Sequence, residues 1–219
     1  INGFQSLKFP KMVKKKIGII DCEFGNIASL VNAIKFLNHN YQIISKEKSF
    51  DDFSHLFLPG VGSFHDAVIK IKKLGVDDKI KKHIEKSKPF MGICIGMQLL
   101  FEKGLENGPQ DGLGIFQGKC EKFSEKLNLS LPHIGFNLVE NPKTSIWKGI
   151  NNPAPFYFVH SYRVLTNSES EDKEIKIAKT NYGENFISFI EKNNVYGAQF
   201  HPEKSHKWGE KLLINFSKL

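Results

Sequence analysis

The sequence predicts an α/β fold: a doubly wound, mostly parallel sheet with helices on both faces and a partly antiparallel extension in the C-terminal half. In the N-terminal half, short apolar runs alternate with segments whose apolar residues recur at helical spacing, which favours a parallel sheet. After Gly112 the pattern changes to short strand-like runs separated by turn residues, which is typical of antiparallel or mixed strands. A chain of 219 residues can bury the core of one such domain.

The N-terminal half provides the expected parallel strands in order. Lys16 to Asp21 forms a first strand, and a helix follows because apolar residues from Ile27 to Leu37 share one face. Met12 resembles a natural start, so we expect residues 1–11 to be a leader or an added segment and residues 12–219 to form a single domain. Further strands are expected at 41–45, 55–58 and 90–93, with two lysine-rich amphipathic helices between the last two and an apolar helix over 97–101.

The C-terminal half is expected to complete the sheet with shorter strands. A closing amphipathic helix is predicted over 208–216. The candidate strands are 114–123, 133–139, 156–165, 174–180, 186–191 and 195–200.

Charge and composition narrow the function classes. The formal net charge is +8, but Arg163 is the only arginine, and scattered lysines more often solvate a surface than read nucleic acid. No apolar run approaches the roughly 20 residues that span a bilayer. The three cysteines are widely spaced and lack metal-ligand spacing, which favours a reducing cytoplasm. We therefore expect no nucleic-acid partner, no membrane partner, no metal and no cofactor.

The segment Gly92-Ile93-Cys94-Ile95-Gly96 has the pattern of a nucleophile elbow with a thiol in place of a hydroxyl. A strand that turns abruptly into a helix presents the residue at the joint over the sheet edge. The first N–H groups of the helix can stabilise a thiolate there. Alone, the pentapeptide is equally compatible with a buried structural cysteine beside two turn glycines.

A thiol nucleophile needs a base, and His201 is the strongest candidate among the eight histidines. It follows a strand-like run, and Glu203 stands two residues later, where its carboxylate can hold the imidazole. A lone His-Pro-Glu turn is more often an ordinary loop, so the prediction depends on the combination with Cys94.

An oxyanion needs preorganised donors, and two segments supply backbone N–H groups. The first is Gly60-Val61-Gly62 at the end of a strand, from which Val61 and Gly62 are candidate donors, and the second is Ile95, directly after the cysteine. By itself, the glycine-rich segment is more often a simple turn.

Five motifs together carry a family resemblance that none carries alone. They are LPGVGSF (58–64), GICIGMQLL (92–100), LPHIGFN (131–137), FVHSY (158–162) and YGAQFHPEKS (196–205). Their residues and order resemble the triad-type, or class I, glutamine amidotransferases, and most closely the glutaminase subunits of imidazole glycerol phosphate synthase. The resemblance covers essentially the whole chain after Met12.

The resemblance implies residue roles. Cys94 would attack the carboxamide of L-glutamine, His201 would transfer the proton, and Glu203 would orient the imidazole. The remaining implied residues are Gly62, Gln98, Ser161 and Tyr162 for the amino-acid end of glutamine, and Asn26 and Lys204 for the partner interface.

The resemblance also implies a partner, a (β/α)₈-barrel cyclase subunit in a heterodimer that uses the ammonia in histidine biosynthesis. Phe136, where the family often has tryptophan, and His206, where it often has glycine, depart from the pattern, as does the loop 23–26. These departures keep open a paralogous glutaminase that supplies ammonia to a sugar amidine-forming enzyme. Two other classes also stay open: a stand-alone cysteine hydrolase or peptidase, and a non-catalytic basic binding module.

Overall fold

The computed structural model describes residues 15–23, 27–45, 49–165 and 172–219. The segment 1–11 expected to be a leader and the expected interface residue Asn26 therefore lie outside the described residues.

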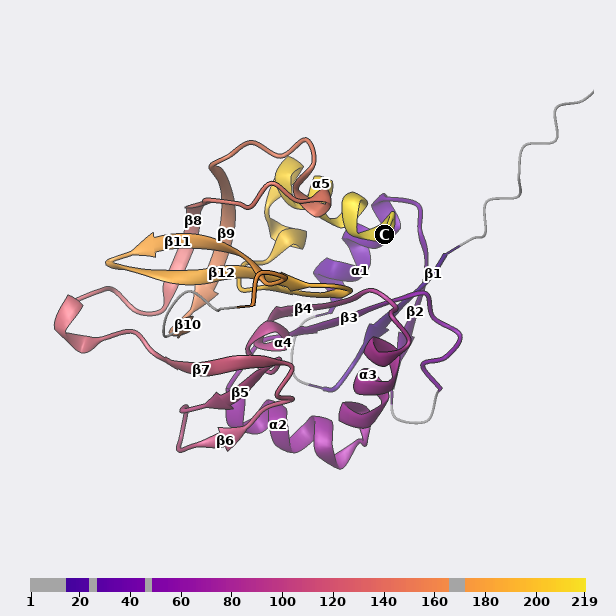
Figure 1. Ribbon diagram of the computed structural model, residues 1–219, viewed down its shortest axis with the longest axis horizontal. Coiled ribbons are helices and arrows are strands. Elements are labelled where there is room, and N and C mark those ends of the chain that lie inside the picture. The colour runs from indigo at the N-terminus through magenta and orange to yellow at the C-terminus, as the bar shows by residue number, and fades with distance from the viewer. Residues whose placement is uncertain (1–14, 24–26, 46–48, 166–171) are drawn as a thin grey trace, which may run out of the picture.

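A seven-stranded sheet forms the centre of the molecule (Figure 1). Its strand order is β11-β12-β13-β4-β3-β1-β2; the neighbours from β13 to β2 are parallel, whereas β12 is antiparallel to both β11 and β13. This confirms the predicted doubly wound, mostly parallel sheet with an antiparallel extension. The strands are β1 (Lys16–Ile20), β2 (Asn40–Ile44), β3 (His55–Gly60), β4 (Phe90–Cys94), β11 (Lys176–Tyr182), β12 (Glu184–Lys192) and β13 (Val195–Ala198).

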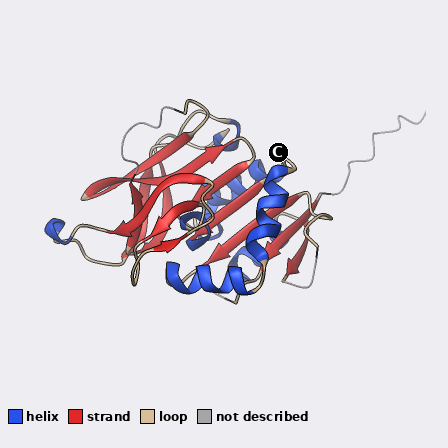
Figure 2. Cartoon of the chain, turned by 60° about the horizontal axis from the view of Figure 1, so that its bottom comes forward, coloured by secondary structure: helices blue, strands red, loops and turns tan. Residues whose placement is uncertain are grey.

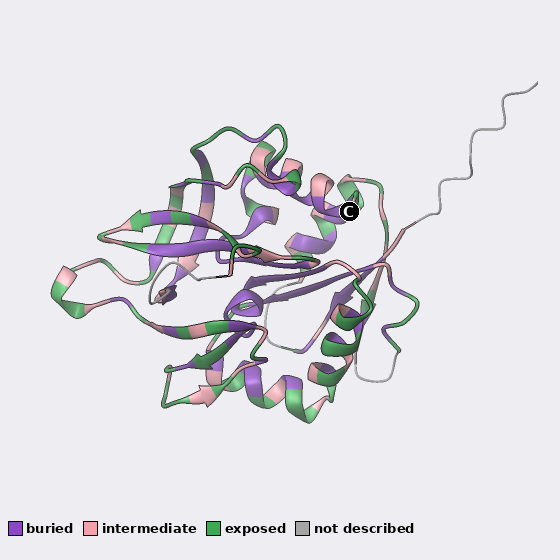
Figure 3. Cartoon of the chain, viewed as in Figure 1, coloured by how far each residue is buried: buried purple, intermediate pink, exposed green. Residues whose placement is uncertain are grey.

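Helices cover both faces of this sheet (Figure 2). One core contains apolar residues of α2 (Phe64–Lys73) and α3 (Val76–Glu85), and the other contains those of α1 (Ala28–Phe36) and α5 (His206–Ser217). Alternate residues of the central strands enter the two cores, as Leu56 and Phe57 do on β3. The central strands are accordingly buried along their whole length (Figure 3).

The remaining strands form two smaller sheets. One has the order β10-β7-β5-β6 and the other pairs β8 with β9. The chain passes from one sheet to the other at Ser161, so the single strand predicted over 156–165 is wrong: the structure has two. These strands are β5 (Phe101–Gly104), β6 (Gln110–Asp111), β7 (Phe116–Lys122), β8 (His133–Val139), β9 (Ala154–His160) and β10 (Tyr162–Leu165), with 3₁₀ turns at Glu125–Leu127, Ser145–Trp147 and Pro202–Lys204.

The apolar helix predicted over 97–101 is also wrong in its extent. Helix α4 spans only Ile95–Gln98, and Phe101 begins strand β5. The carbonyl of Leu99 accepts a hydrogen bond from the N–H of Leu113 at 2.7 Å instead of continuing the helix. Pairing with a distant segment thus overrides the local apolar pattern. None of the described helices is long and apolar enough to cross a lipid bilayer.

Candidate functional site

Cys94 lies at the joint between β4 and α4, with φ +55° and ψ −111°. This conformation is strained for a non-glycine residue, as a nucleophile elbow requires. The flanking glycines make the tight joint possible: a Cβ on Gly92 would overlap the carbonyl of Gly96, and a Cβ on Gly96 would overlap the carbonyl oxygen of Leu58. The pattern around Cys94 therefore reflects close backbone packing as well as a turn.

His201 lies beside the elbow because β13 and β4 are parallel neighbours, with Ala198 paired to Ile93. The N–H of His201 donates to the carbonyl of Tyr157 at 2.8 Å, which fixes the backbone just past the sheet edge. Its Nδ1 lies 2.7 Å from Oε1 of Glu203, and both side chains are buried. The 3₁₀ turn at Pro202–Lys204 brings the carboxylate back to the ring.

The charge on His201 is stabilised within this cluster. Burial opposes the charged ring, but the Cys94 sulfur and the Glu203 carboxylate raise the pKa of His201 to about 10. Its Nε2 is buried and has no hydrogen-bond partner among the described residues. A thiolate beside an imidazolium is the reactive form of a cysteine nucleophile.

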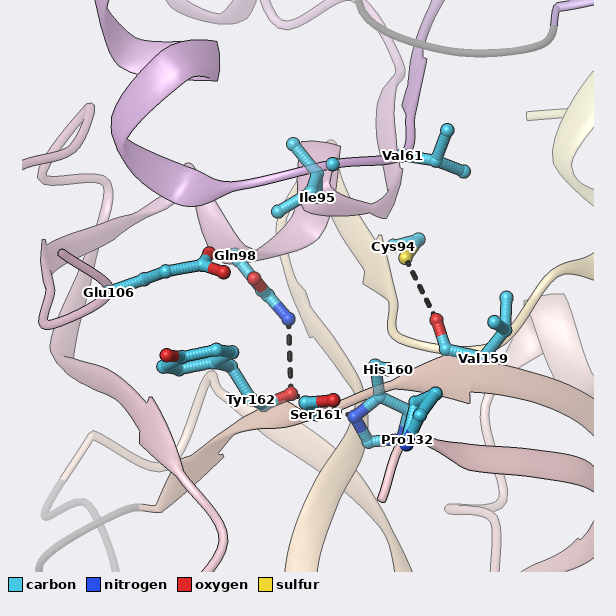
Figure 4. A pocket seen from close by; sticks show the side chains of 11 residues that line it. Val61, Cys94, Ile95, Gln98, Glu106, Pro132, Val159, His160, Ser161 and Tyr162 are labelled. Atoms are coloured by element: carbon cyan, nitrogen blue, oxygen red, sulfur yellow. Dashed lines mark hydrogen bonds between the residues drawn. The ribbon is translucent and has the colours of Figure 1, made fainter.

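A pocket of about 220 Å³ opens at Cys94. Figure 4 shows Val61 and Ile95 on one side of it and Ser161 and His160 on the opposite side. The segment carrying Val61 lies next to the elbow because β3 and β4 are paired up to their last residues. The pocket is lined by Val61, Gly62, Cys94, Ile95, Gln98, Glu106, Pro132, Val159, His160, Ser161 and Tyr162.

Every pocket residue expected from the motifs for glutamine or for its oxyanion is thus part of one lining. Gln98 is 2% exposed, and its amide nitrogen donates to the carbonyl of Tyr162 at 3.1 Å and to Oε1 of Gln199 at 2.9 Å. The Oε1 atom of Gln98 has no hydrogen-bond partner among the described residues. A buried acceptor without a partner is rare, which makes this oxygen a candidate to accept a hydrogen bond from a ligand.

Sequence reasoning missed two polar residues of the site. Glu106 lines the pocket, and its carboxylate accepts the N–H of Phe64 at 2.7 Å. Gln199 Nε2 lies 3.8 Å from the Cys94 sulfur. Gln199 belongs to the motif YGAQFHPEKS (196–205) and could have been identified from it. Nothing in the local sequence distinguishes Glu106 from other surface carboxylates.

An exposed patch lies beside the site on β8 and β9. Ile134, Phe136 and Leu138 alternate along β8 and are 60%, 49% and 53% exposed. Phe136 stacks on His206 with ring centroids 5.2 Å apart, and the exposed Lys204 places its Nζ 5.8 Å from the ring centre of Tyr157. Two of the three departures from the family pattern, Phe136 and His206, therefore contact each other within one surface.

An elbow cysteine beside a carboxylate-paired histidine, at the carboxyl edge of a doubly wound sheet, is the arrangement of an α/β thiol enzyme. The family described as "Glutamine amidotransferase class-I" matches residues 18–218. The chain is 45% identical to "Imidazole glycerol phosphate synthase subunit HisH" of Caldanaerobacter subterraneus subsp. tengcongensis, over 93% of this chain and 98% of that protein. The protein of the same name from Aquifex aeolicus is 44% identical, over 91% of this chain and 95% of the relative. The chain belongs to the class I glutamine amidotransferases, and within them to the HisH subunits of imidazole glycerol phosphate synthase.

Solved structures agree on the fold. The "Structure of PurLQS from Thermotoga maritima" superposes with a TM-score of 0.73 at 18% identity, covering 93% of this chain and 97% of that chain. At that level of identity the similarity establishes the fold alone.

Proposed function

We propose that the chain is the glutaminase subunit of imidazole glycerol phosphate synthase, with Cys94, His201 and Glu203 as its catalytic triad. It hydrolyses L-glutamine to glutamate and delivers ammonia to a cyclase subunit in histidine biosynthesis. The observation that carries the proposal is the meeting of the Cys94 elbow with the His201–Glu203 pair beside a pocket. The similarity to relatives named as HisH subunits, over 93% and 91% of this chain, supports the role in histidine biosynthesis.

The reaction follows from these groups. The Cys94 thiolate attacks the carboxamide carbon and forms a tetrahedral oxyanion, for which Val61, Gly62 and Ile95 offer backbone N–H groups. The His201 imidazolium gives its proton to the departing ammonia, leaving a γ-glutamyl thioester. The neutral imidazole then takes a proton from water, whose oxygen attacks the thioester, and glutamate leaves as the thiolate is restored. Glu203 holds the imidazole in one orientation throughout.

The amino-acid end of glutamine is assigned to the opposite end of the pocket. The free acceptor of Gln98 and the carboxylate of Glu106 suit an α-ammonium group, because both can accept from its three donors. Ser161 and Tyr162 complete this end, and Gly62 contributes backbone. The carboxamide then points toward Cys94.

The ammonia must pass directly to an acceptor, because free ammonia is mostly protonated and unreactive at neutral pH. We assign the partner as a (β/α)₈-barrel cyclase that binds over the apolar patch of Ile134, Phe136 and Leu138 and beside Lys204. Three free, buried cysteines suit a reducing cytoplasm.

The test is a glutaminase assay on the chain alone and in the presence of the purified cyclase subunit from the same genome. We expect glutamine-dependent glutamate release that rises when the cyclase is added together with its nucleotide substrate. The Cys94→Ser variant should lose activity by at least about a thousandfold while binding the cyclase normally, since the hydroxyl is a far weaker nucleophile.

A matched control is Cys120→Ser, which alters another buried free thiol outside the pocket lining. It should keep activity within about threefold of the unsubstituted chain, apart from any loss of stability. Glutamate release that survives Cys94→Ser, or a chain that the cyclase neither binds nor stimulates, would contradict the proposal.

A further inference from the structure

Two buried histidines that take no part in the triad form a hydrogen-bonded chain leading to the glutamine pocket. Nδ1 of His160 lies 2.7 Å from the carbonyl of Tyr162, and Nε2 of His160 lies 3.1 Å from Nδ1 of His133. On the far side, Nε2 of His133 lies 3.4 Å from the amide nitrogen of Asn137. His160 itself lines the pocket (Figure 4).

The carbonyl of Tyr162 at one end of this row of hydrogen bonds and the amide of Asn137 at the other end fix the direction of each bond between them. The Tyr162 carbonyl can only accept, so His160 carries its proton on Nδ1 and must accept at Nε2. His133 therefore donates from Nδ1 and accepts at Nε2. The Asn137 amide nitrogen supplies that last donor, because its oxygen accepts the N–H of Leu138 at 2.8 Å and so faces the other way. Both histidines are thus held as the Nδ1–H tautomer.

The surroundings keep both rings neutral. His133 is stacked between Tyr182 and Phe158, with centroids 4.0 and 4.9 Å away. Burial lowers the pKa of His133 to about 4. Burial, together with the neighbouring His133 and His201, lowers the pKa of His160 to about 3, although the bond to Tyr162 opposes this. Both acceptor nitrogens therefore persist at neutral pH.

The carbonyl that His160 holds lies where the chain changes from one sheet to another. Ser161 is the joint between β9 and β10, which belong to different sheets; its own carbonyl accepts the N–H of Phe123 at 3.3 Å, and Tyr162 is the first residue of β10. The carbonyl of Tyr162 accepts from His160 on one side and from Gln98 on the other, which uses both of its lone pairs. The position of Gln98 therefore depends on the same carbonyl.

We propose that His160 is a positioning residue for the amino-acid end of glutamine: its Nδ1–H holds the carbonyl of Tyr162 and, through it, Gln98, while His133 fixes the tautomer of His160. The inference rests on the proposed glutaminase function for its kinetic consequence. The tautomers themselves do not depend on that function.

The test compares two substitutions, each of which keeps a hydrogen-bonding group near one of the two ring nitrogens of His160. In His160→Asn the side-chain amide stands near the position of Nδ1 and can still donate to the Tyr162 carbonyl. In His160→Gln the amide stands near Nε2, so it can still reach His133 but leaves that carbonyl with one donor fewer. With the cyclase bound, we expect His160→Gln to raise the KM for glutamine about tenfold, with kcat within about threefold, and His160→Asn to stay near the wild-type KM.

His83→Gln is the matched control. His83 is equally buried and bonds a carbonyl, that of Pro89, at 3.2 Å, but it is not among the residues that line the pocket. It should cost comparable stability and leave KM unchanged. Equal KM values for the two His160 variants, or a KM shift in His83→Gln as large as that of His160→Gln, would overturn the positioning role.

Nitrogen-15 NMR of the two rings provides a readout that needs no activity. We expect a protonated Nδ1 and an unprotonated Nε2 in both histidines at neutral pH, and an Nε2–H signal from His160 would overturn the inference. The glutaminase function and the positioning role of His160 can be contradicted independently of each other. Loss of glutaminase function from the unsubstituted chain would remove the proposed function and leave the tautomers readable, whereas unchanged KM values in an active, Cys94-dependent glutaminase would remove only this inference.

Discussion

The reactivity of Cys94 depends on side chains that come from another strand. Its sulfur lies near His201 and 3.8 Å from the Gln199 amide, both of which follow β13. Only Glu203 is close in sequence to the histidine that it holds. The cysteine therefore acquires its chemistry when β13 pairs with β4, and a change in any of these partners should act on kcat more than on folding.

Glu203→Gln keeps the shape of the side chain and removes its charge. Because the carboxylate contributes to the raised pKa of His201, the variant should lower that pKa and leave less imidazolium beside the thiolate. We expect kcat/KM for glutamine to fall about a hundredfold or more, and the alkaline limb of the pH–rate profile to move to lower pH.

The control for this variant is Glu191→Gln, another partly buried glutamate, whose carboxylate accepts from the Thr144 hydroxyl at 3.1 Å rather than from a histidine. It should leave the pH profile unmoved. If Glu203→Gln kept both the rate and the profile of the wild type, Glu203 would not be the orienting group.

The elbow depends on the packing of three elements, β3, β4 and α4, rather than on one residue. Gly92 and Gly96 let the backbone of α4 lie directly against the strands, and the positive φ of Cys94 turns the chain between them. The strain is maintained because β4 is hydrogen-bonded on both sides, to β3 and to β13.

Gly96→Ala tests this packing. The new methyl group would overlap the carbonyl oxygen of Leu58, which is backbone in a central strand and cannot move aside cheaply. We expect a loss of about 2–4 kcal/mol in the free energy of unfolding, measured by urea titration, together with loss of glutaminase activity.

Gly75→Asn is the comparison for that experiment. Gly75 has φ +60° with open space around its Cα, and asparagine tolerates this conformation, so the loss should stay below about 1 kcal/mol. Equal unfolding midpoints for the two variants would show that the elbow does not require a bare backbone at position 96.

Sequence reasoning succeeded where local pattern and tertiary structure agree. Alternating apolar runs and helical periodicity place the parallel strands within one or two residues, because those strands are buried on both faces. It failed at Phe101, where pairing with a distant segment ends the helix, and at Ser161, where an apolar strand changes sheet. Neither event has a local signature. The residues of the pocket inferred from motifs lie together, whereas Glu106 enters the site only through the fold.

The molecule as a whole buries several histidines as neutral groups. Burial lowers the pKa of His55, His83 and His133 to about 4 each and that of His160 to about 3. His201 is the opposite case, because its partners raise its pKa to about 10. The two kinds of histidine make the stability of the fold depend on pH in opposite directions and in different ranges.

The pH dependence follows from these shifts. An unfolded histidine takes up its proton below about pH 6.5, whereas the four buried rings stay neutral until the pH approaches their lowered values, so the unfolded state binds more protons in between. Their contribution to stability is complete above about pH 6.5 and is lost as the pH falls toward 4. The contribution of His201 is complete below about pH 6.5 and is lost only as the pH rises through 10. We expect the free energy of unfolding to fall between about pH 7 and pH 5 by roughly 1–2 kcal/mol per buried histidine.

Urea titrations across this range measure that fall, and His83→Gln separates one histidine from the rest. The glutamine amide can still donate to the Pro89 carbonyl but does not titrate, so the variant should show a shallower pH dependence by up to one proton. Few carboxylates change charge between about pH 7 and pH 5, which leaves the histidines as the main titrating groups there. An unfolding free energy that stayed constant over this interval, or an identical slope in His83→Gln, would mean that the buried rings do not resist protonation in the folded state.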